Sequence, residues 1–591
     1  MFRPRDQQSS LFTSSLLLPD EKRIRLESDW PGEFRRSMLP LIDEEIFRDL
    51  YCRDNGCPNK PAQILVATLI LKEFHDYTDM QALGALDYDL RWHVALDLEP
   101  GETHCCQKTL HNFRARLMRD DRARVLFVDM VAKIMALLGI DASKQRLDST
   151  HIMSNIARLT RLGLICETAR KFLKELKRTF GGKYRSLPEP LRARYLKADG
   201  DDSSYDDARS SESKRRIAVC ARDVWRLFDR FRGDKRVTKL ESYGLLERLV
   251  AEQCEIVEEP QAPVEGDADA GEGAVPVVVK EAKSVRSDSL QSPHDAAVTY
   301  SGHKGKGVEV QIAETVDNGE KPEIITYSEL TRSCDSDEDA TVPAVDDLAE
   351  REIQPDELLT DTNYGSTANV IELERRGTEL VAPVAGRDIA AEEKSEPVES
   401  QTASDGATDA VGDLAEGASA PRPDDGREID KGEFDVDVKG ERSARCPGAH
   451  EAVDERCDAG TGAVRLVFAA SSCAACPLAD RCPAKRRTDG TRVLKTTLHE
   501  TVLARRRRYE RTPEFRKRYA RRAGIEGTNS ELKRVNGLGR LRVRGPKRVR
   551  LAVRFKTLAC DVKRALGYLV ERARAAARAA AAALEGATEA A

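Results

Sequence analysis

Long hydrophobic runs are missing from the sequence. The N-terminal stretch "LFTSSLLL" is short, is broken by hydroxyl side chains and is followed by charges instead of a small-residue cleavage site, which excludes a signal peptide. No other run approaches the roughly 20 apolar residues that a membrane-spanning helix needs. We therefore expect a soluble, cytoplasmic protein with no membrane partner.

A one-sided net charge is also missing. Lys and Arg number 96 and Asp and Glu number 101, so the formal charge of -5 singles out no class of partner. The balance is uneven along the chain, because residues 501–550 hold 18 basic and 4 acidic side chains whereas residues 387–441 hold 6 basic and 17 acidic ones. The first segment is expected to attract polyanions and the second to repel them.

Tandem repeats of fixed period are absent as well, and 591 residues are too many for one ordinary core. Composition and periodicity divide the chain into an N-terminal leader (1–45), a helical domain (46–120), a first strand (140–156), a helical and linker insertion (157–285), further strands with a crossover (286–386), an acidic disordered linker (387–441), a Cys-rich insertion (442–490), a helix with a basic C-terminal part (491–571) and an Ala-rich tail (572–591). The helical domain is expected to bind DNA, and a bundle that merely packs is an equal expectation.

Alternating and β-branched patterns predict the strands of a sheet. Residues 145–152, "QRLDSTHI", form a short strand that carries Asp148. Further along, Asn318 and Gly319 lie between two β-rich stretches and predict a hairpin. Residues 356–384 have the pattern strand, loop, helix, strand, with Asp361 directly after the first strand. Chemistry in open α/β sheets collects at the carboxyl ends of strands, so Asp361 is well placed for a functional role.

Three acidic side chains are candidate metal ligands: Asp148, Asp361 and Glu526. Taken singly, an Asp after a strand is more often a cap or turn residue. Two aspartates on neighbouring strands and a glutamate on a later helix can together form an oxygen-rich site for hard cations such as Mg²⁺. Two such ions can activate a nucleophilic oxygen and stabilise the leaving oxygen in phosphodiester cleavage.

The stretch "YARRAGIEGTNSELK" is predicted to be one helix, and at offsets of 3, 7 and 14 four of its side chains fall on one stripe. These are Tyr519, Arg522, Glu526 and Lys533. The alternative is a solvated charged face with an ordinary ion pair between Arg522 and Glu526. Gly524 and Gly527 count against that alternative, because each costs about 1 kcal/mol in a helix interior. Their bare backbone permits close approach of DNA or of a sheet.

A cysteine-rich patch is a separate signal. Four of the 14 cysteines are candidate zinc ligands: Cys446, Cys473, Cys476 and Cys482. A C-x2-C pair followed by a third cysteine resembles a structural zinc knuckle. Cys457 competes for the fourth position, and a site without metal or with an iron-sulfur cluster remains open.

A Gly-rich loop, "SGHKGKG", places His303 and Lys304 ahead of a strand. Both side chains are candidates for phosphate contact beside an active site, and a flexible exposed turn is an equal expectation. The basic stretches on either side of Glu526 would add salt-sensitive affinity for a nucleic-acid backbone.

The motifs resemble a known family. "RLDSTHI", "LLTDTNYGS" and "YARRAGIEGTNSELK" are similar to the three catalytic segments of bacterial insertion-sequence transposases of the DDE class, and the last contains the Tyr-x2-Arg-x3-Glu-x6-Lys signature in full. The N-terminal stretches "DYDLRWHVALDL" and "KTLHNFRARL" resemble that family's helical domain. "GHKGKGVEVQIAET" and "CAACPLADRC" resemble stretches of the insertion-sequence family numbered eleven-eighty-two.

The resemblance implies an α/β, RNase H-like core, a mixed sheet with helices that is interrupted by insertions. Asp148 would lie on its first strand, Asp361 after its fourth and Glu526 on a late helix. It further implies two Mg²⁺ or Mn²⁺ ions, strand cleavage at the element's inverted repeats and 3′-hydroxyl transfer into target DNA. The expected form is a nucleoid-associated homodimer that pairs two ends, in which Tyr519, Arg522 and Lys533 position the strand.

One departure concerns hairpin formation. Some relatives stack a flipped base on an aromatic residue between the second Asp and the Glu, whereas all three tryptophans here (Trp30, Trp92 and Trp225) precede Asp361. A hairpin step is therefore not implied. The rival function is a non-catalytic, zinc-stabilised DNA-binding protein, a domesticated or decayed relative. A nuclease acting on ordinary cellular nucleic acid is a weaker alternative.

Overall fold

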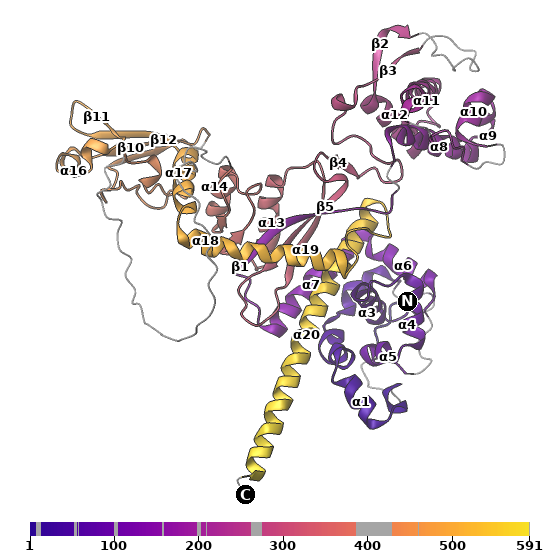
Figure 1. The fold of residues 1–591 in the computed structure, drawn as a ribbon, viewed down its shortest axis with the longest axis horizontal. Coiled ribbons are helices and arrows are strands. Elements are labelled where there is room, and N and C mark those ends of the chain that lie inside the picture. Colours follow the sequence, from indigo (N-terminus) through magenta and orange to yellow (C-terminus); the bar gives the residue numbers. More distant parts are fainter. Residues whose placement is uncertain are drawn as a thin grey trace, which may run out of the picture. The chain divides into compact units, whose positions relative to one another are not determined.

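The computed structural model describes residues 1–6, 14–52, 56, 58–99, 105–156, 159–197, 202–207, 210–261, 275–385, 428–458 and 460–589 (Figure 1). The chain forms two compact units. The first unit comprises Met1–Ser336, Glu350–Ile353 and Ala523–Ala591, and the second comprises Asp337–Ala349 and Gln354–Arg522. No helix in the described ranges is long and apolar enough to cross a membrane.

Short helices open the first unit. They are η1 (Ser14–Leu17), α1 (Asp20–Glu27), α2 (Trp30–Glu33), η2 (Phe34–Met38), η3 (Leu39–Leu41), η4 (Glu44–Leu50), α3 (Ala62–Phe74), α4 (Asp79–Tyr88), α5 (Leu90–Leu96), α6 (Gln107–Leu117), η5 (Arg119–Asp121) and α7 (Arg122–Leu138). Helix α4 begins with the reciprocal bonds of a capping box, since Thr78 Oγ1 accepts from the backbone of Gln81 and the Gln81 side chain accepts from the backbone of Thr78. The helical character predicted for residues 46–120 is confirmed, and the predicted leader, 1–45, contains short helices as well.

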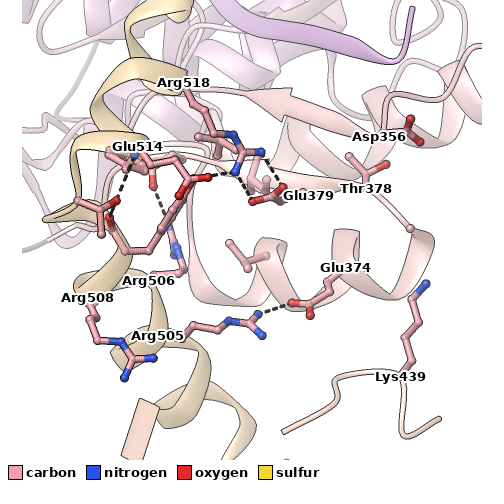
Figure 2. A pocket seen from close by; sticks show the side chains of 18 residues that line it. Asp356, Glu374, Thr378, Glu379, Lys439, Arg505, Arg506, Arg508, Glu514 and Arg518 are labelled. Carbon is pink, nitrogen blue, oxygen red and sulfur yellow. Dashed lines mark hydrogen bonds and ion pairs between the residues drawn. The ribbon is translucent and has the colours of Figure 1, made fainter. Parts of the chain in front are cut away.

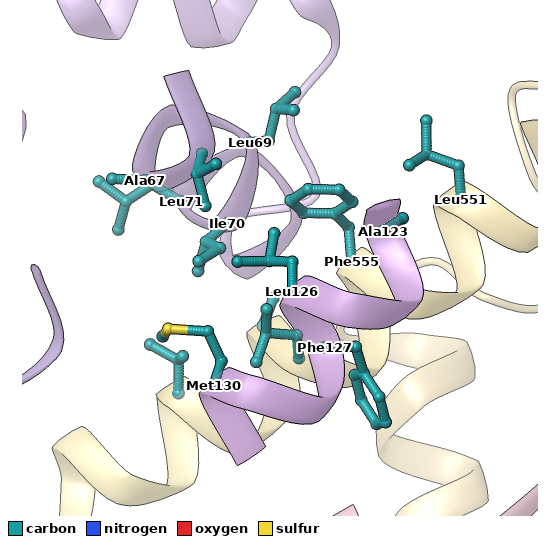
Figure 3. Packing of buried hydrophobic residues seen from close by; sticks show 14 of the residues in the cluster. Ala67, Leu69, Ile70, Leu71, Ala123, Leu126, Phe127, Met130, Leu551 and Phe555 are labelled. Carbon is teal, nitrogen blue, oxygen red and sulfur yellow. The ribbon is translucent and has the colours of Figure 1, made fainter. Parts of the chain in front are cut away.

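The last helix of the chain shares its core with these N-terminal helices. Helix α20 (Pro546–Glu589) packs against α3 and α7. Figure 3 shows Leu69 and Ile70 of α3, Phe127 of α7, and Leu551 and Phe555 of α20 in one apolar cluster. Burial of this surface, at about 25 cal/mol per Å² of apolar area, therefore stabilises the two ends of the sequence together.

An antiparallel sheet continues this core. Its strands in the first unit are β1 (Lys144–Ile152), β4 (Thr299–Ser301), β5 (Gly305–Thr315) and β6 (Ile325–Arg332). Strand β5 pairs with β1, β4 and β6, and Asp148 lies opposite Ile312. The predicted strand at 145–152 is confirmed. The hairpin between β5 and β6 is confirmed too, and Gly319 in its turn has a φ of +69°, a left-handed conformation that favours glycine.

A helical insertion separates β1 from β4 and has its own core. It contains α8 (Arg161–Thr179), α9 (Gly181–Arg185), α10 (Glu189–Tyr195), α11 (Ser210–Phe231), α12 (Glu241–Gln253), the strand pair β2 (Cys254–Gln261) and β3 (Val275–Val279), and η6 (Ala282–Ser284). Phe172, Leu227 and Leu246 are buried there. The helical and linker insertion predicted for residues 157–285 corresponds to this part of the chain.

The second unit contains the expected crossover. Helix α13 (Glu338–Glu350) precedes β7 (Glu357–Leu359), α14 (Thr367–Arg376) and β8 (Glu379–Val381). Strands β7 and β8 are parallel neighbours, with Leu358 opposite Leu380. The order strand, loop, helix, strand is confirmed.

A Cys-rich module follows in the second unit. It contains η7 (Lys431–Glu433), β9 (Asp454–Cys457), β10 (Ala463–Phe468), α16 (Ala470–Ala474), η8 (Ala479–Arg481), β11 (Lys485–Arg486) and β12 (Arg492–Thr497). The strand order is β11-β12-β10-β9. Phe434 and Val436 are buried in the module's core, so ordered structure begins before residue 441, where the acidic linker was expected to end. The rest of that predicted linker, 387–427, lies outside the described residues.

Helices follow the module: α17 (Leu498–Glu510), α18 (Pro513–Tyr519), η9 (Ala520–Ala523) and α19 (Gly524–Arg534). Residues 519–533 are thus not one uniform α-helix, because the 3₁₀ turn η9 interrupts the predicted α-helix. Tyr519 ends α18 and Arg522 lies in η9, both in the second unit, whereas α19 belongs to the first. The common stripe of all four side chains therefore stays a prediction. Glu526 and Lys533 both lie on α19, seven residues apart and on one face.

Candidate functional site

The first unit brings β1 and α19 together at Asp148. The Asp148 side chain is half-buried on β1. Asn529 of α19 donates from Nδ2 to Asp148 Oδ2 at 3.1 Å, although the two residues are 381 positions apart in the chain. Glu526 precedes Asn529 by one turn of the same helix, so the two side chains project from one face. Two of the three predicted carboxylates, Asp148 and Glu526, therefore belong to one region of one compact unit.

A buried ion cluster fixes α19 against the sheet. Glu314 of β5 is fully buried and accepts from Arg146 Nε at 2.7 Å, from Thr528 Oγ1 at 2.6 Å and from Arg564 at 3.1 Å. Thr528 precedes Asn529 on α19, and Arg564 lies on α20. A buried carboxylate is stable only when its partners are in place. This cluster therefore fixes the position of α19 along β1.

The glycines of α19 have different surroundings. A Cβ on Gly524 would lie 2.1 Å from a guanidinium nitrogen of Arg146, and that guanidinium is held by Glu314. Gly524 therefore allows the helix to approach the sheet, as the sequence suggested. Gly527 has open space where a Cβ would be, and the structure gives no reason for glycine there.

Asp361 lies in the second unit, directly after β7. Its Oδ1 accepts from the backbone N–H of Asn363 at 2.8 Å, and its Oδ2 lies 4.0 Å from Arg522. The side chain is thus both a turn residue and an ion-pair partner. Its meeting with Asp148 and Glu526 in one site stays a prediction.

Two lysines carry positive charge toward the Asp148 region. Lys304, in the turn before β5, contacts Ser149 Oγ at 3.4 Å and buried Glu309 at 2.9 Å. Burial lowers the pKa of Lys533, the Lys304 charge lowers it further, and the negative charge of Asp148 opposes both effects. His303 is exposed in the same turn as Lys304. The positions of both lysines fit a role on phosphate.

Tyr519 and His151 have structural contacts. Tyr519 stacks on Phe515 with 5.5 Å between ring centroids and 8° between planes. His151 packs against Gly307, where a Cβ would lie 2.3 Å from its Nε2. This packing agrees with a structural role for His151.

The second unit has a separate cavity of about 720 Å³ lined by α14, β8, α17 and α18 (Figure 2). Its arginines are largely occupied by the fold. Arg505 pairs with Glu374 at 2.5 Å and Arg518 pairs with Glu379 at 2.7 Å. Burial lowers the pKa of Arg506 to about 10, and its guanidinium donates to backbone carbonyls. Part of the basic run thus stabilises this unit and is not a free DNA-binding face.

The four predicted zinc ligands lie near one another. Burial raises the pKa of Cys473, the positive charge of Arg492 opposes this, and the neighbouring Cys446, Cys482 and Cys476 raise it further. A Cβ on Gly448 would lie 3.2 Å from the sulfur of Cys476 and 3.6 Å from that of Cys446. Every cysteine in the described ranges is a free thiol. No group of three or more His, Cys, Asp or Glu side chains among the described residues is arranged to hold a metal ion, so the zinc site and the three-carboxylate magnesium site both stay predictions.

The donors at the predicted magnesium site are nonetheless of the right kind. Carboxylate oxygens are the ligands that Mg²⁺ and Mn²⁺ prefer. The Oδ1 of Asn529 is buried and has no hydrogen-bond partner among the described residues, so an acceptor oxygen is left on the side chain that contacts Asp148. Sequence reasoning missed Asn529. The signal available was a pair of poor helix formers, Thr528 and Asn529, in the middle of a short helix.

Two family models match parts of the chain. Residues 23–116 match the transposase domain DUF772, and residues 445–566 match the transposase DDE domain. These matches support a transposase. The DDE match contains the strands of the Cys-rich module and Glu526 but not the module's first residues, 431–444. Transposases with this domain act on DNA and generally use a divalent metal such as Mg²⁺. No curated protein and no solved structure matches the chain.

Proposed function

We propose that the chain is a DDE transposase that cleaves DNA at the ends of an insertion sequence and joins the freed 3′-hydroxyl to target DNA. One observation carries the proposal: the Asn529 hydrogen bond ties the helix that bears Glu526 to the strand that bears Asp148. The match of residues 445–566 to the transposase DDE domain supports it independently.

In this proposal, Asp148, Glu526 and Asp361 hold two Mg²⁺ or Mn²⁺ ions. When bound, such a pair activates the attacking oxygen and stabilises the leaving oxygen. Asn529 orients the Asp148 carboxylate through its 3.1 Å bond. The ion cluster around Glu314 keeps α19, and with it Glu526, in register with β1.

The basic side chains position the DNA strand. Lys304 and Lys533 lie near Asp148 and would bind phosphates that flank the scissile bond. Arg522, Tyr519 and His303 are proposed to extend this contact along the strand. Water attacks the phosphodiester in the first reaction and a DNA 3′-hydroxyl attacks in the second, so no enzyme side chain becomes covalently attached. Pairing of two element ends requires at least a homodimer.

The test compares wild type with Glu526→Gln on DNA that carries the repeats flanking the gene, with Mg²⁺ present. The substitution keeps the size of the side chain and removes its charge. We expect strand cleavage and joining to fall by more than about 10³-fold while DNA binding stays within about twofold, since a catalytic metal ligand is lost. Equal turnover by the two proteins would reject the catalytic assignment, and absence of turnover by wild type would favour the non-catalytic DNA-binding rival.

We also infer a structural zinc ion in the Cys-rich module, bound by Cys446, Cys473, Cys476 and Cys482. Their proximity and the C-x2-C spacing support it. Metal analysis of purified protein should find about one zinc per chain, and Cys476→Ser should lower that content and the stability of the module. Cys457→Ser is the control, because Cys457 is exposed on β9. Fully stable, zinc-free wild type would remove this inference.

A further inference from the structure

A groove in the first unit lies away from the proposed catalytic residues. It is a cavity of about 660 Å³ lined by residues of α4 and α6, by the segment 542–544 and by the start of α20. We call it the α6 groove. Its floor is apolar and includes buried Leu69, Leu551 and Phe555. These floor residues belong to the apolar core that α3, α7 and α20 share (Figure 3).

The charges around the α6 groove are not balanced. Arg114 is neutralised by Asp79, which also faces Lys72, and Arg542 is paired with Asp76 at 2.8 Å. In contrast, the exposed side chains of Arg544 and Arg548 make no hydrogen bond or ion pair with any described residue. Two positive charges therefore remain available beside the groove. Unpaired exposed guanidinium groups contribute little to folding and attract polyanions.

Helix α6 presents an amide and an imidazole side chain to the same groove. Gln107 and His111 are one turn apart, are exposed, and line the cavity. A different face of α6 buries Leu110 and Phe113 in the core. A glutamine and a histidine on a rigid helix can bond to the edges of bases, whereas arginines beside the helix suit phosphates. An acidic protein surface could form ion pairs with the arginines, but charge complementarity alone would not use the glutamine and the histidine.

We propose that the α6 groove is a sequence-reading site for duplex DNA. Gln107 and His111 contact base edges in the major groove, and Arg544 and Arg548 hold the flanking phosphates. The proposal rests on the proposed function, because a transposase must find its DNA ends. It gives the matched DUF772 segment, which includes α6, a specific role in recognition.

The experiment begins with selection of duplexes from a pool with a randomised centre by wild-type protein, followed by binding titrations over a range of salt concentrations. Arg544→Ala with Arg548→Ala should weaken binding to all duplexes and lower the slope of log K against log salt by about two. Gln107→Ala with His111→Ala should reduce the preference for the selected duplex over a scrambled one by about tenfold or more and leave the salt slope unchanged. Lys235→Ala with Arg236→Ala, which removes two exposed cations from the helical insertion, is the matched control and should bind like wild type.

Three outcomes overturn the proposal: wild type that selects no duplex, groove variants that bind and discriminate like wild type, or tighter competition by polyglutamate than by duplex DNA at equal charge. Glu526→Gln should select the same duplex as wild type. A wild type that selects a duplex through the groove and fails to cleave it keeps this inference and rejects the proposed function. If wild type cleaves DNA and the groove variants bind like wild type, the proposed function is kept and this inference is rejected.

Discussion

At the scale of single residues, Asn529 connects the two elements that carry Asp148 and Glu526. It is nearly buried, with 9% of its surface exposed, and uses one side-chain group on Asp148 while the other has no partner among the described residues. An amide is suited to this position because it donates to a carboxylate without adding charge.

Replacing Asn529 should therefore damage catalysis more than folding. Asn529→Asp places a second negative charge beside Asp148, and Asn529→Ala removes the bond. We expect either change to lower the cleavage rate by about 10- to 100-fold and to shift the Mn²⁺ concentration needed for half-maximal rate upward. Ser530→Ala, one position further along α19, is the control. An unchanged Mn²⁺ dependence in both Asn529 variants would remove the assigned role.

His75 gives the N-terminal helices a pH dependence. Its ring packs among Trp30, Phe74 and Tyr77. Burial lowers the pKa of His75 to about 4 from its ordinary 6.5, and the nearby positive charges of Arg91 and Lys563 add to the effect while Asp89 opposes it. Between pH 6.5 and about 4, the ring of His75 is therefore neutral in the folded state but protonated in the unfolded chain.

Stability should be fully present above pH 6.5 and should fall as the pH drops from 6.5 toward 4, because only the unfolded chain takes up the proton in that window. His75→Phe keeps an aromatic ring and cannot take up a proton, so the variant should lose less folding stability than wild type between pH 6.5 and 4. Denaturant unfolding of wild type and variant across the window measures the difference, with His303→Gln, in an exposed turn, as the control. Parallel pH curves for wild type and His75→Phe would show that His75 contributes nothing.

At the scale of elements, much was predictable from local signals. The strand at Asp148 and the β5–β6 hairpin follow from alternation and turn residues, and the β7–α14–β8 order follows from the change of period. The ion cluster under α19 depends on partners far away in the sequence, above all Glu314. Periodicity contains no information about such partners. It also predicts a uniform α-helix by default, and the 3₁₀ turn at residues 520–523 departs from that prediction.

The two glycines of α19 offer a matched pair. Gly524→Ala would place a methyl group against the held guanidinium of Arg146, and we expect a loss of about 1–3 kcal/mol in stability together with reduced cleavage. Gly527→Ala meets open space and should gain about 0.5–1 kcal/mol through higher helix propensity. Thermal unfolding of both variants tests the packing of α19 on β1. Equal effects of the two substitutions would contradict it.

At the scale of the whole molecule, the chain uses distant segments for each task. The N-terminal helices and α20 share one core, and the proposed catalytic residues come from β1, the β7 loop and α19. The sequence indicated which segments carry the proposed catalytic residues, because each motif is a short local stretch. It could not indicate which contacts hold those segments together, since these contacts join residues hundreds of positions apart, such as Asn529 and Asp148.

Iron-directed cleavage of the protein tests most directly whether the three carboxylates surround the same divalent ions. Fe²⁺ replaces Mg²⁺ at oxygen-ligand sites, and with ascorbate and peroxide it cuts the backbone beside its ligands. We predict cuts near Asp148, Asp361 and Glu526 that appear at one Fe²⁺ concentration, are suppressed by excess Mg²⁺, and disappear together in Glu526→Gln. Cuts confined to β1 and α19, with the loop after β7 intact at every Fe²⁺ concentration, would contradict a site built from all three.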